Sequence, residues 1–184
     1  MPRRRWPRPE PLVTTRLELD PLRLEHARQM APLLADPALY THIGGRPPSE
    51  AELAAQYARQ VRGASADGRQ GWLNWVMRLR PERLPVGLVQ ATLTGRRPRY
   101  AAELAWIVGS PYQGSGLATE GARAVMAWLG AAGCASFSAH IHPANTASAI
   151  VARRLGLVES ALVEGGERRW VAPAPDSSAE VAPH

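Results

Sequence analysis

The sequence predicts a single α/β domain in which helices pack against a mixed, mostly antiparallel β-sheet. Three observations support this prediction. A chain of 184 residues with 45% apolar and 21% charged side chains is large enough to form one domain with its own core. Two helical segments near the start are followed, after Gly63, by segments with the period of strands. Three of these strand-like segments follow one another through short turn-like connections, which favour antiparallel neighbours.

The predicted elements follow in the order β, α, α, β, β, β, α, β, α, β, β. Residues 14–19 alternate polar and apolar side chains as a half-buried strand does. Residues 23–35 carry an apolar stripe at helical spacing and end before Pro37. Residues 49–62 form a second helix, with Ser49 as its N-cap and acidic residues in its first turn.

The second part of the chain alternates strands and helices. Strands are predicted at residues 72–80, 86–94 and 101–108. They are followed by a helix at 115–132, a strand at 135–141, a helix at 146–155, and strands at 157–163 and 168–171. Residues 1–11 and 173–184 are rich in proline and lack periodicity, so we expect flexible tails around one domain of residues 12–172.

Composition excludes several classes of enzyme. All 22 basic residues are arginine, so no lysine is present for a Schiff base, a Walker A motif or a lysine base. The single cysteine, Cys134, excludes an intrachain disulfide and a cysteine zinc cluster. The start lacks a secretory apolar region and no run is long enough to span a bilayer, so we expect a cytoplasmic protein without membrane contact. The bias toward Arg, Ala, Pro and Gly is typical of a GC-rich bacterial gene.

The net charge of +6 suits an anionic ligand such as CoA or a nucleotide. The arginines are scattered along the chain, which argues against nucleic acid as the main partner. The Arg-rich start at residues 3–8 nevertheless keeps a nucleic-acid-associated role open.

The most informative motif lies where the strand at residues 101–108 passes into the next helix. Residues 113–118 read Gln-Gly-Ser-Gly-Leu-Ala. Backbone N–H groups at a helix N-terminus are unpaired and favour an anion, and glycines let a phosphate approach without an intervening Cβ. Thr119 replaces the third glycine of a dinucleotide fingerprint, and a P-loop would need lysine. The loop is either a cradle for another diphosphate or a glycine-rich helix start without a ligand.

The pattern Gln-x-x-Gly-x-Ala at residues 113–118 resembles the acyl-CoA pyrophosphate loop of the GNAT N-acetyltransferase superfamily. Asn145 and Ser148, followed by Leu-Gly-Leu at residues 155–157, are similar to a segment of its ribosomal-protein alanine N-acetyltransferase (RimJ/RimL-like) branch, in which phenylalanine usually replaces the last leucine. The resemblance is specific over residues 100–160 and looser over residues 14–94.

The resemblance implies a GNAT-like α/β sandwich. Its sheet is splayed between strands 4 and 5, residues 101–108 and 135–141, with acetyl-CoA between them. Backbone groups of Ile107 and Val108 would pair with the pantetheine amides, and the glycine loop would hold the pyrophosphate. Asn145 would hydrogen-bond the pantetheine arm, and Arg153 or Arg154 would contact the 3′-phosphate. The implied cofactor-binding residues are Ile107, Val108, Gln113, Gly114, Ser115, Gly116, Leu117, Ala118, Asn145 and Arg153. No metal is implied.

Two residues are candidates for the chemistry of acyl transfer. Glu103 is the one charge in its strand, and alternation places it on the face of Ala105 and Ile107. It resembles the glutamate that many GNAT enzymes use as a general base; alternatively it is a solvated carboxylate or only positions substrate. Ser148 matches the serine that would protonate the leaving thiolate; alternatively it caps its helix. Tyr100 and Tyr112 are other candidates for the acid.

The remaining reactive side chains are expected to be structural. His140 and His142 stand two residues apart, as metal ligands can, but no third ligand completes a pattern, so they are expected to line the core or a pocket. Cys134 lies in a turn among small apolar residues and is expected to be an inert thiol.

Two classes of function follow from the resemblance. The first is an N-acetyltransferase that moves an acetyl group from acetyl-CoA to a primary amine through a ternary complex. The alternative is a non-catalytic acyl-CoA-binding or nucleic-acid-associated module. Glu103, Asn145 and Ser148 beside the glycine loop favour the enzyme. The acceptor could be a protein N-terminus or a small-molecule amine, and the chain could act as a monomer or a homodimer.

Overall fold

The computed structural model describes residues 6–96 and 98–172. Its elements, in chain order, are β1 (Leu12–Val13), β2 (Leu17–Pro21), α1 (His26–Leu33), η1 (Pro37–Tyr40), α2 (Glu50–Gln60), β3 (Gly71–Leu79), β4 (Leu84–Arg96), β5 (Arg99–Val108), η2 (Ser110–Tyr112), α3 (Leu117–Ala131), β6 (Cys134–Ile141), α4 (Thr146–Arg154), β7 (Val158–Glu164) and β8 (Glu167–Val171). None of the described helices is long and apolar enough to cross a membrane.

The described strands form one eight-stranded sheet of order β1-β2-β3-β4-β5-β6-β8-β7. Neighbouring strands pair antiparallel except β5 and β6, which run parallel because α3 connects them as a crossover. The mixed, mostly antiparallel sheet predicted from the sequence is therefore confirmed.

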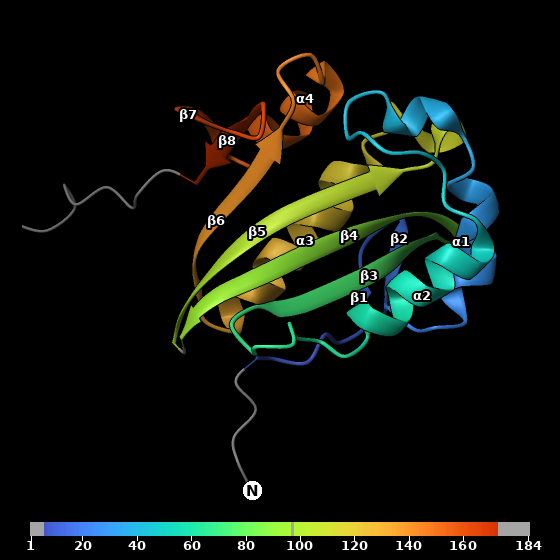
Figure 1. Cartoon of the computed structure of the whole chain (residues 1–184), viewed down its shortest axis with the longest axis horizontal. Helices are drawn as coiled ribbons and strands as arrows, with labels where there is room; N and C mark the ends of the chain where they lie inside the picture. The colour runs from blue at the N-terminus through green and yellow to red at the C-terminus, as the bar shows by residue number, and fades with distance from the viewer. Residues whose placement is uncertain (1–5, 97, 173–184) are drawn as a thin grey trace, which may run out of the picture.

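Helices cover both faces of the sheet, as Figure 1 shows. Helix α3 packs on one face, where its apolar residues meet alternate side chains of β2 to β5, including the fully buried Trp75 and Leu104. Helices α1 and α2 pack on the other face over Val76 and Leu88. Helix α4 covers the end of β6 in a smaller cluster around Trp170.

The predicted order of elements is also confirmed, with three short additions: β1, η1 and η2. Helix α2 begins as predicted at the Ser49 cap. The Ser49 side chain accepts from the Glu52 N–H and the Glu52 carboxylate accepts from the Ser49 N–H, so a complete capping box fixes the start of the helix.

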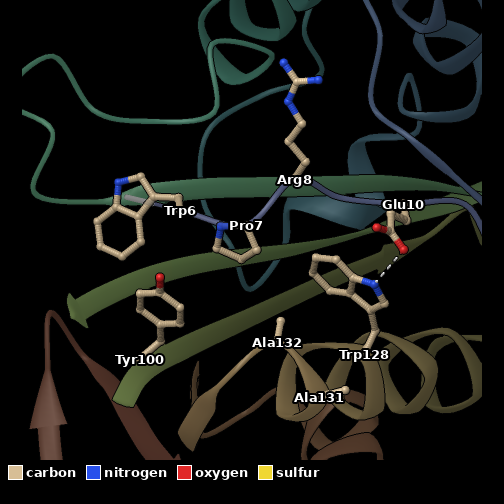
Figure 2. A pocket seen from close by; sticks show the side chains of 8 residues that line it. All are labelled: Trp6, Pro7, Arg8, Glu10, Tyr100, Trp128, Ala131 and Ala132. Atoms are coloured by element: carbon tan, nitrogen blue, oxygen red, sulfur yellow. Dashed lines mark hydrogen bonds between the residues drawn. The ribbon is translucent and has the colours of Figure 1, made fainter. Parts of the chain in front are cut away.

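The expectation of a flexible tail over residues 1–11 is wrong from Trp6 onward. Trp6 is only 8% exposed, and it packs against Tyr100 and over Gly71, where a Cβ would lie 2.6 Å from the indole ring. The Trp75 Nε1–H donates to the Glu10 carbonyl at 2.8 Å. Figure 2 shows this segment running across Tyr100 and Trp128. Together they line an open pocket of about 350 Å³. The bulk of one indole anchors a proline-rich segment that has no periodicity of its own. Residues 1–5 and 173–184 lie outside the described residues.

Candidate acyl-CoA site

The sheet opens between β5 and β6, and this opening organises the candidate site. The two strands pair from Tyr100 with Cys134 to Glu103 with Ser138, and the pairing then ends. Strand β5 continues to Val108 and β6 to Ile141 without meeting again, so they diverge toward their C-terminal ends (Figure 1). The splay expected between these two strands is therefore present, and beyond Glu103 no described strand pairs with this edge of β5.

The direction of backbone groups along β5 decides which of them face the opening. The Tyr100 N–H donates to the Gly133 carbonyl on the β6 side, whereas the Gly109 N–H donates to the Val86 carbonyl on the β4 side. By alternation, the backbone groups of Trp106 and Val108 face the opening, and those of Ile107 face β4. The Val108 carbonyl already accepts from Gln113 Nε2 at 2.9 Å. The backbone groups available to an added strand are therefore the Val108 N–H and those of Trp106, which the sequence prediction did not include.

The glycine loop lies at the C-terminal end of β5 and forms the start of α3. Gly114 and Gly116 have φ of 75° and 82°, a left-handed conformation that strains any other L-residue. No described residue accepts a hydrogen bond from the N–H of Gly114, Ser115 or Gly116. A Cβ at Gly114 would meet nothing within 4 Å, so the loop surface is open at this point. The loop thus presents successive unpaired N–H groups at the positive end of a helix.

The loop is held from behind by Arg16, which directly precedes β2. The Arg16 guanidinium donates to the Ser115 carbonyl at 2.8 Å and to the Glu120 carboxylate at 2.7 Å. Glu120 also accepts from the Thr14 hydroxyl and the Arg16 N–H. Burial raises the pKa of Glu120, but these hydrogen bonds and the charge of Arg16 outweigh burial and lower it. The brace leaves the N–H side of the loop free.

Glu103 lies on the face of β5 opposite α3 and points across the opening toward β6. Its carboxylate is 3.2 Å from His140 Nδ1, and the other ring nitrogen of His140 is 3.1 Å from the carboxylate of Glu164 on β7. The contact with Glu164 has hydrogen-bond geometry, whereas the contact with Glu103 is an ion-pair contact when the imidazole is protonated. The Glu103 side chain is 52% exposed, whereas that of His140 is 16% exposed. The sequence identified Glu103 and His140 separately and missed Glu164.

The first turn of α4 lies at the C-terminal end of β6, across the opening from the glycine loop. Asn145 caps the helix, because its Oδ1 accepts from the Ser148 N–H at 3.0 Å. The Ser148 hydroxyl forms no hydrogen bond with another described residue. Arg153 lies at the far end of α4 with its guanidinium over the Trp170 ring, 5.3 Å from its centroid. The structure therefore brings Asn145 and Ser148 to the opening and directs Arg153 away from it.

The remaining candidate side chains are His142, Tyr100 and Cys134. His142 stacks on His42 from the segment after η1, with ring centroids 5.6 Å apart. No group of three potential metal ligands occurs among residues 6–96 and 98–172. Tyr100 is buried at the opposite end of β5 from the glycine loop. Burial raises the pKa of the Cys134 thiol to about 11, which fits an inert side chain.

The sheet with its opening, the loop and the crossover helix define a mixed α/β fold, and comparison with known proteins gives the family. The family model of the acetyltransferase (GNAT) domain matches residues 16–158. The chain belongs to this family. No curated protein sequence matches it significantly.

Solved structures share the fold at low identity. A probable GNAT-family acetyltransferase from Chromobacterium violaceum is 20% identical with a TM-score of 0.72, over 92% of this chain and 88% of its own. The ribosomal L7/L12 α-N-protein acetyltransferase RimL in complex with coenzyme A is 18% identical with a TM-score of 0.71, over 90% and 98%. The microcin C7 self-immunity acetyltransferase MccE in complex with acetyl-CoA and AMP is 14% identical with a TM-score of 0.65, over 86% and 92%.

Proposed function

We propose that the protein is an N-acetyltransferase that moves the acetyl group of acetyl-CoA to a primary amine through a ternary complex. The observation that carries the proposal is the convergence of three groups on one opening. The N–H groups of residues 114–118 lie on one side, Asn145 and Ser148 lie on the other, and the Glu103 carboxylate lies between β5 and β6.

The binding half of the proposal assigns each part of acetyl-CoA to groups that are free to hold it. The pyrophosphate fits the unpaired N–H groups from Gly114 to Ala118. The pantetheine amides fit the exposed β5 edge at Trp106 and Val108, as an added strand does. Asn145 offers its Nδ2 to the same arm, since its Oδ1 already caps α4. The 3′-phosphate is better served by a cation other than Arg153, which stacks on Trp170.

The chemical half of the proposal assigns two proton transfers. Glu103 takes the proton from the acceptor ammonium, directly or through water, so that the amine nitrogen can attack the acetyl carbonyl carbon. The C–N bond then forms and the C–S bond breaks. The departing sulfur accepts a hydrogen bond from the Ser148 hydroxyl and takes up the proton that the amine nitrogen loses as it becomes an amide nitrogen, so CoA leaves as the thiol. His140, held between Glu103 and Glu164, fixes the orientation of the Glu103 carboxylate.

The binding half is tested by titrating acetyl-CoA into wild type and Gly116→Glu, with circular dichroism as the check on folding. We expect wild type to bind and Gly116→Glu to lose binding, because any side chain strains the left-handed backbone at Gly116 and the new carboxylate would compete for Arg16, whose guanidinium lies 3.6 Å from the added Cβ. Both effects displace the N–H groups that would hold the pyrophosphate. A folded Gly116→Glu variant that binds like wild type would show that the loop is not the cradle.

The chemical half is tested with Glu103→Gln, which keeps the shape of the side chain and removes its basicity. We expect unchanged affinity for acetyl-CoA and a kcat lower by about 10²–10⁴-fold, with most of the loss recovered at alkaline pH, where solvent deprotonates the amine. A raised KM with nearly unchanged kcat would instead assign Glu103 to docking a cationic acceptor.

A further inference from the structure

A polar cavity of about 290 Å³ lies on the sheet face that carries Glu103. It is bounded by the C-terminal half of α2 and by strands β3 and β4, and its lining residues are Gln56, Arg59, Gln60, Trp72, Asn74, Gln90, Ala91 and Thr92. The strand register places Thr92 between Trp72 and Glu103 in one cross-strand row, and Gln90 between Asn74 and Ala105 in the next. The cavity therefore begins one strand away from Glu103 and extends from β4 toward α2.

The side chains that line this cavity have unused hydrogen-bonding capacity. Gln56, Gln60, Asn74, Gln90 and Thr92 form no side-chain hydrogen bond with any described residue. Asn74 is only 6% exposed, and the Gln60 Oε1 atom is fully buried without a donor. Buried polar groups in native proteins are normally paired, so Asn74 and the Gln60 Oε1 atom are the groups that a ligand with its own donors and acceptors would satisfy.

The charges around the cavity are arranged asymmetrically. Arg59 lines it and forms no ion pair with a described residue, and the lining residues include no carboxylate. On the other side of the same face, Glu103 and Glu164 flank His140 at the opening of the sheet. A ligand that spans the two regions matches them best when its amine lies at Glu103 and a negative group lies at Arg59. A polycation would bring positive charge to Arg59.

We propose that this cavity binds the acceptor, and that the acceptor is a short peptide-like amine with a carboxylate at its other end. The proposal rests on the proposed function, in which Glu103 deprotonates the acceptor. Adjacent strands lie about 4.8 Å apart, so β3 and β5 are separated by about 10 Å. Three extended residues span at most about 10–11 Å, so a tripeptide-sized molecule reaches from Glu103 into the cavity. Its peptide groups pair with the Asn74 and Gln90 amides, and its carboxylate pairs with Arg59.

Binding measurements test this proposal without requiring turnover. Triglycine, triglycinamide and spermidine are titrated by calorimetry into wild type, Arg59→Gln and Arg62→Gln, each with and without saturating CoA. Arg62→Gln is the matched control, since it removes the same charge three residues away and Arg62 does not line the cavity. Failure of CoA itself to bind would count against the proposed function, and the titrations without CoA would still test the cavity.

We expect wild type to bind triglycine at least tenfold more tightly than triglycinamide, and spermidine more weakly than either. Arg59→Gln should abolish the difference between acid and amide, and Arg62→Gln should preserve it. Asn74→Ala should weaken triglycine and triglycinamide equally, with Gln90→Ala as the second variant should Asn74→Ala fail to fold. No binding of triglycine, equal binding of acid and amide, tighter binding of spermidine, or identical effects of Arg59→Gln and Arg62→Gln would each overturn the proposal.

One further titration identifies the source of the carboxylate. A nine-residue, C-terminally amidated peptide that begins Gly-Gly-Asp carries its acidic group on the third residue of a longer chain. Tighter binding than triglycine assigns the cavity to a protein N-terminus with an early acidic residue, and weaker binding assigns it to a free peptide-like molecule. Either result is consistent with a ligand that combines an amine, peptide groups and a carboxylate, and the two results differ only in the source of the carboxylate.

Discussion

Asn145 serves two purposes with the two atoms of one carboxamide. Its Oδ1 caps α4, and its Nδ2 is free for the pantetheine arm. Asn145→Ala should therefore lower the free energy of unfolding by about 1 kcal/mol and also weaken CoA binding. Asn145→Ser keeps a capping oxygen, so it should recover most of the stability while CoA binding remains weak. Urea denaturation and calorimetry measure the two effects, and a Ser variant with full CoA affinity would remove Asn145 from the binding site.

Glu120 links the brace behind the glycine loop to pH. Because its pKa is lower in the folded protein than in the unfolded chain, it stabilises the fold at pH values above about 4.5, and this stabilisation is lost as pH falls through the folded pKa. Glu120→Gln should lower the free energy of unfolding by about 1.5–3 kcal/mol at pH 7, as loss of hydrogen bonds to a charged group does. The difference from wild type should shrink in urea titrations at pH 3.5. An undiminished difference at that pH would show that the charge of Glu120 does not carry the effect.

The chemistry around Glu103 shows where prediction from the sequence ended at the residue scale. Alternation along one strand was sufficient to place Glu103 on the correct face. The contacts that link Glu103 through His140 to Glu164 were not predictable. His140 and Glu164 come together only because β6 pairs with β8 and β8 pairs with β7. No local pattern in the sequence encodes that register.

Helix α3 fits the sheet closely at one glycine and loosely at another, and this contrast gives a paired test at the scale of the element. A Cβ at Gly121 would lie 2.4 Å from the Sδ of the fully buried Met77, whereas a Cβ at Gly130 would meet nothing within 4 Å. Gly130→Ala should stabilise the protein by up to about 1 kcal/mol through helix propensity. Gly121→Ala should destabilise it, because overpacking typically costs about 1–3 kcal/mol. Thermal and urea unfolding of both variants give the signs, and a stabilised Gly121→Ala would mean that Met77 can move aside.

The segment between α1 and α2 contacts both sides of the opening. The Ser110 hydroxyl, in the connection after β5, donates to the Asp36 carboxylate. Hydrogen bonds from Ser110 and from the Ala38 N–H lower the pKa of Asp36. Farther along, His42 stacks on His142, which follows β6. A segment predicted only as a loop therefore joins the C-terminal ends of the two diverging strands.

The N-terminal segment contributes to the whole molecule, since it closes one end of the core. Trp6→Ala should lower the free energy of unfolding by about 3–5 kcal/mol, as truncation of a buried tryptophan does. Acetyl-CoA affinity of the folded variant should stay unchanged, because Trp6 packs near the start of β5 and the glycine loop follows its end. Leu24→Ala, at a side chain that is 52% exposed, is the control and should change stability by less than about 0.5 kcal/mol. Equal stability of Trp6→Ala and Leu24→Ala would show that residues 6–11 do not contribute to the stability of the core.

The sequence by itself determined the order and type of the elements, the mixed sheet, the glycine loop and the family resemblance. These features depend on periodicity, capping and turn residues, all of which act between residues close together in the chain. The tertiary structure alone decided which backbone groups of β5 face the opening and that Trp6 belongs to the core. It also decided that Arg153 points away from the opening and that side-chain amides of α2, β3 and β4 without a hydrogen-bond partner surround one cavity. These features depend on strand register and on packing between distant segments, where small differences in geometry decide the contact and leave no local pattern in the sequence.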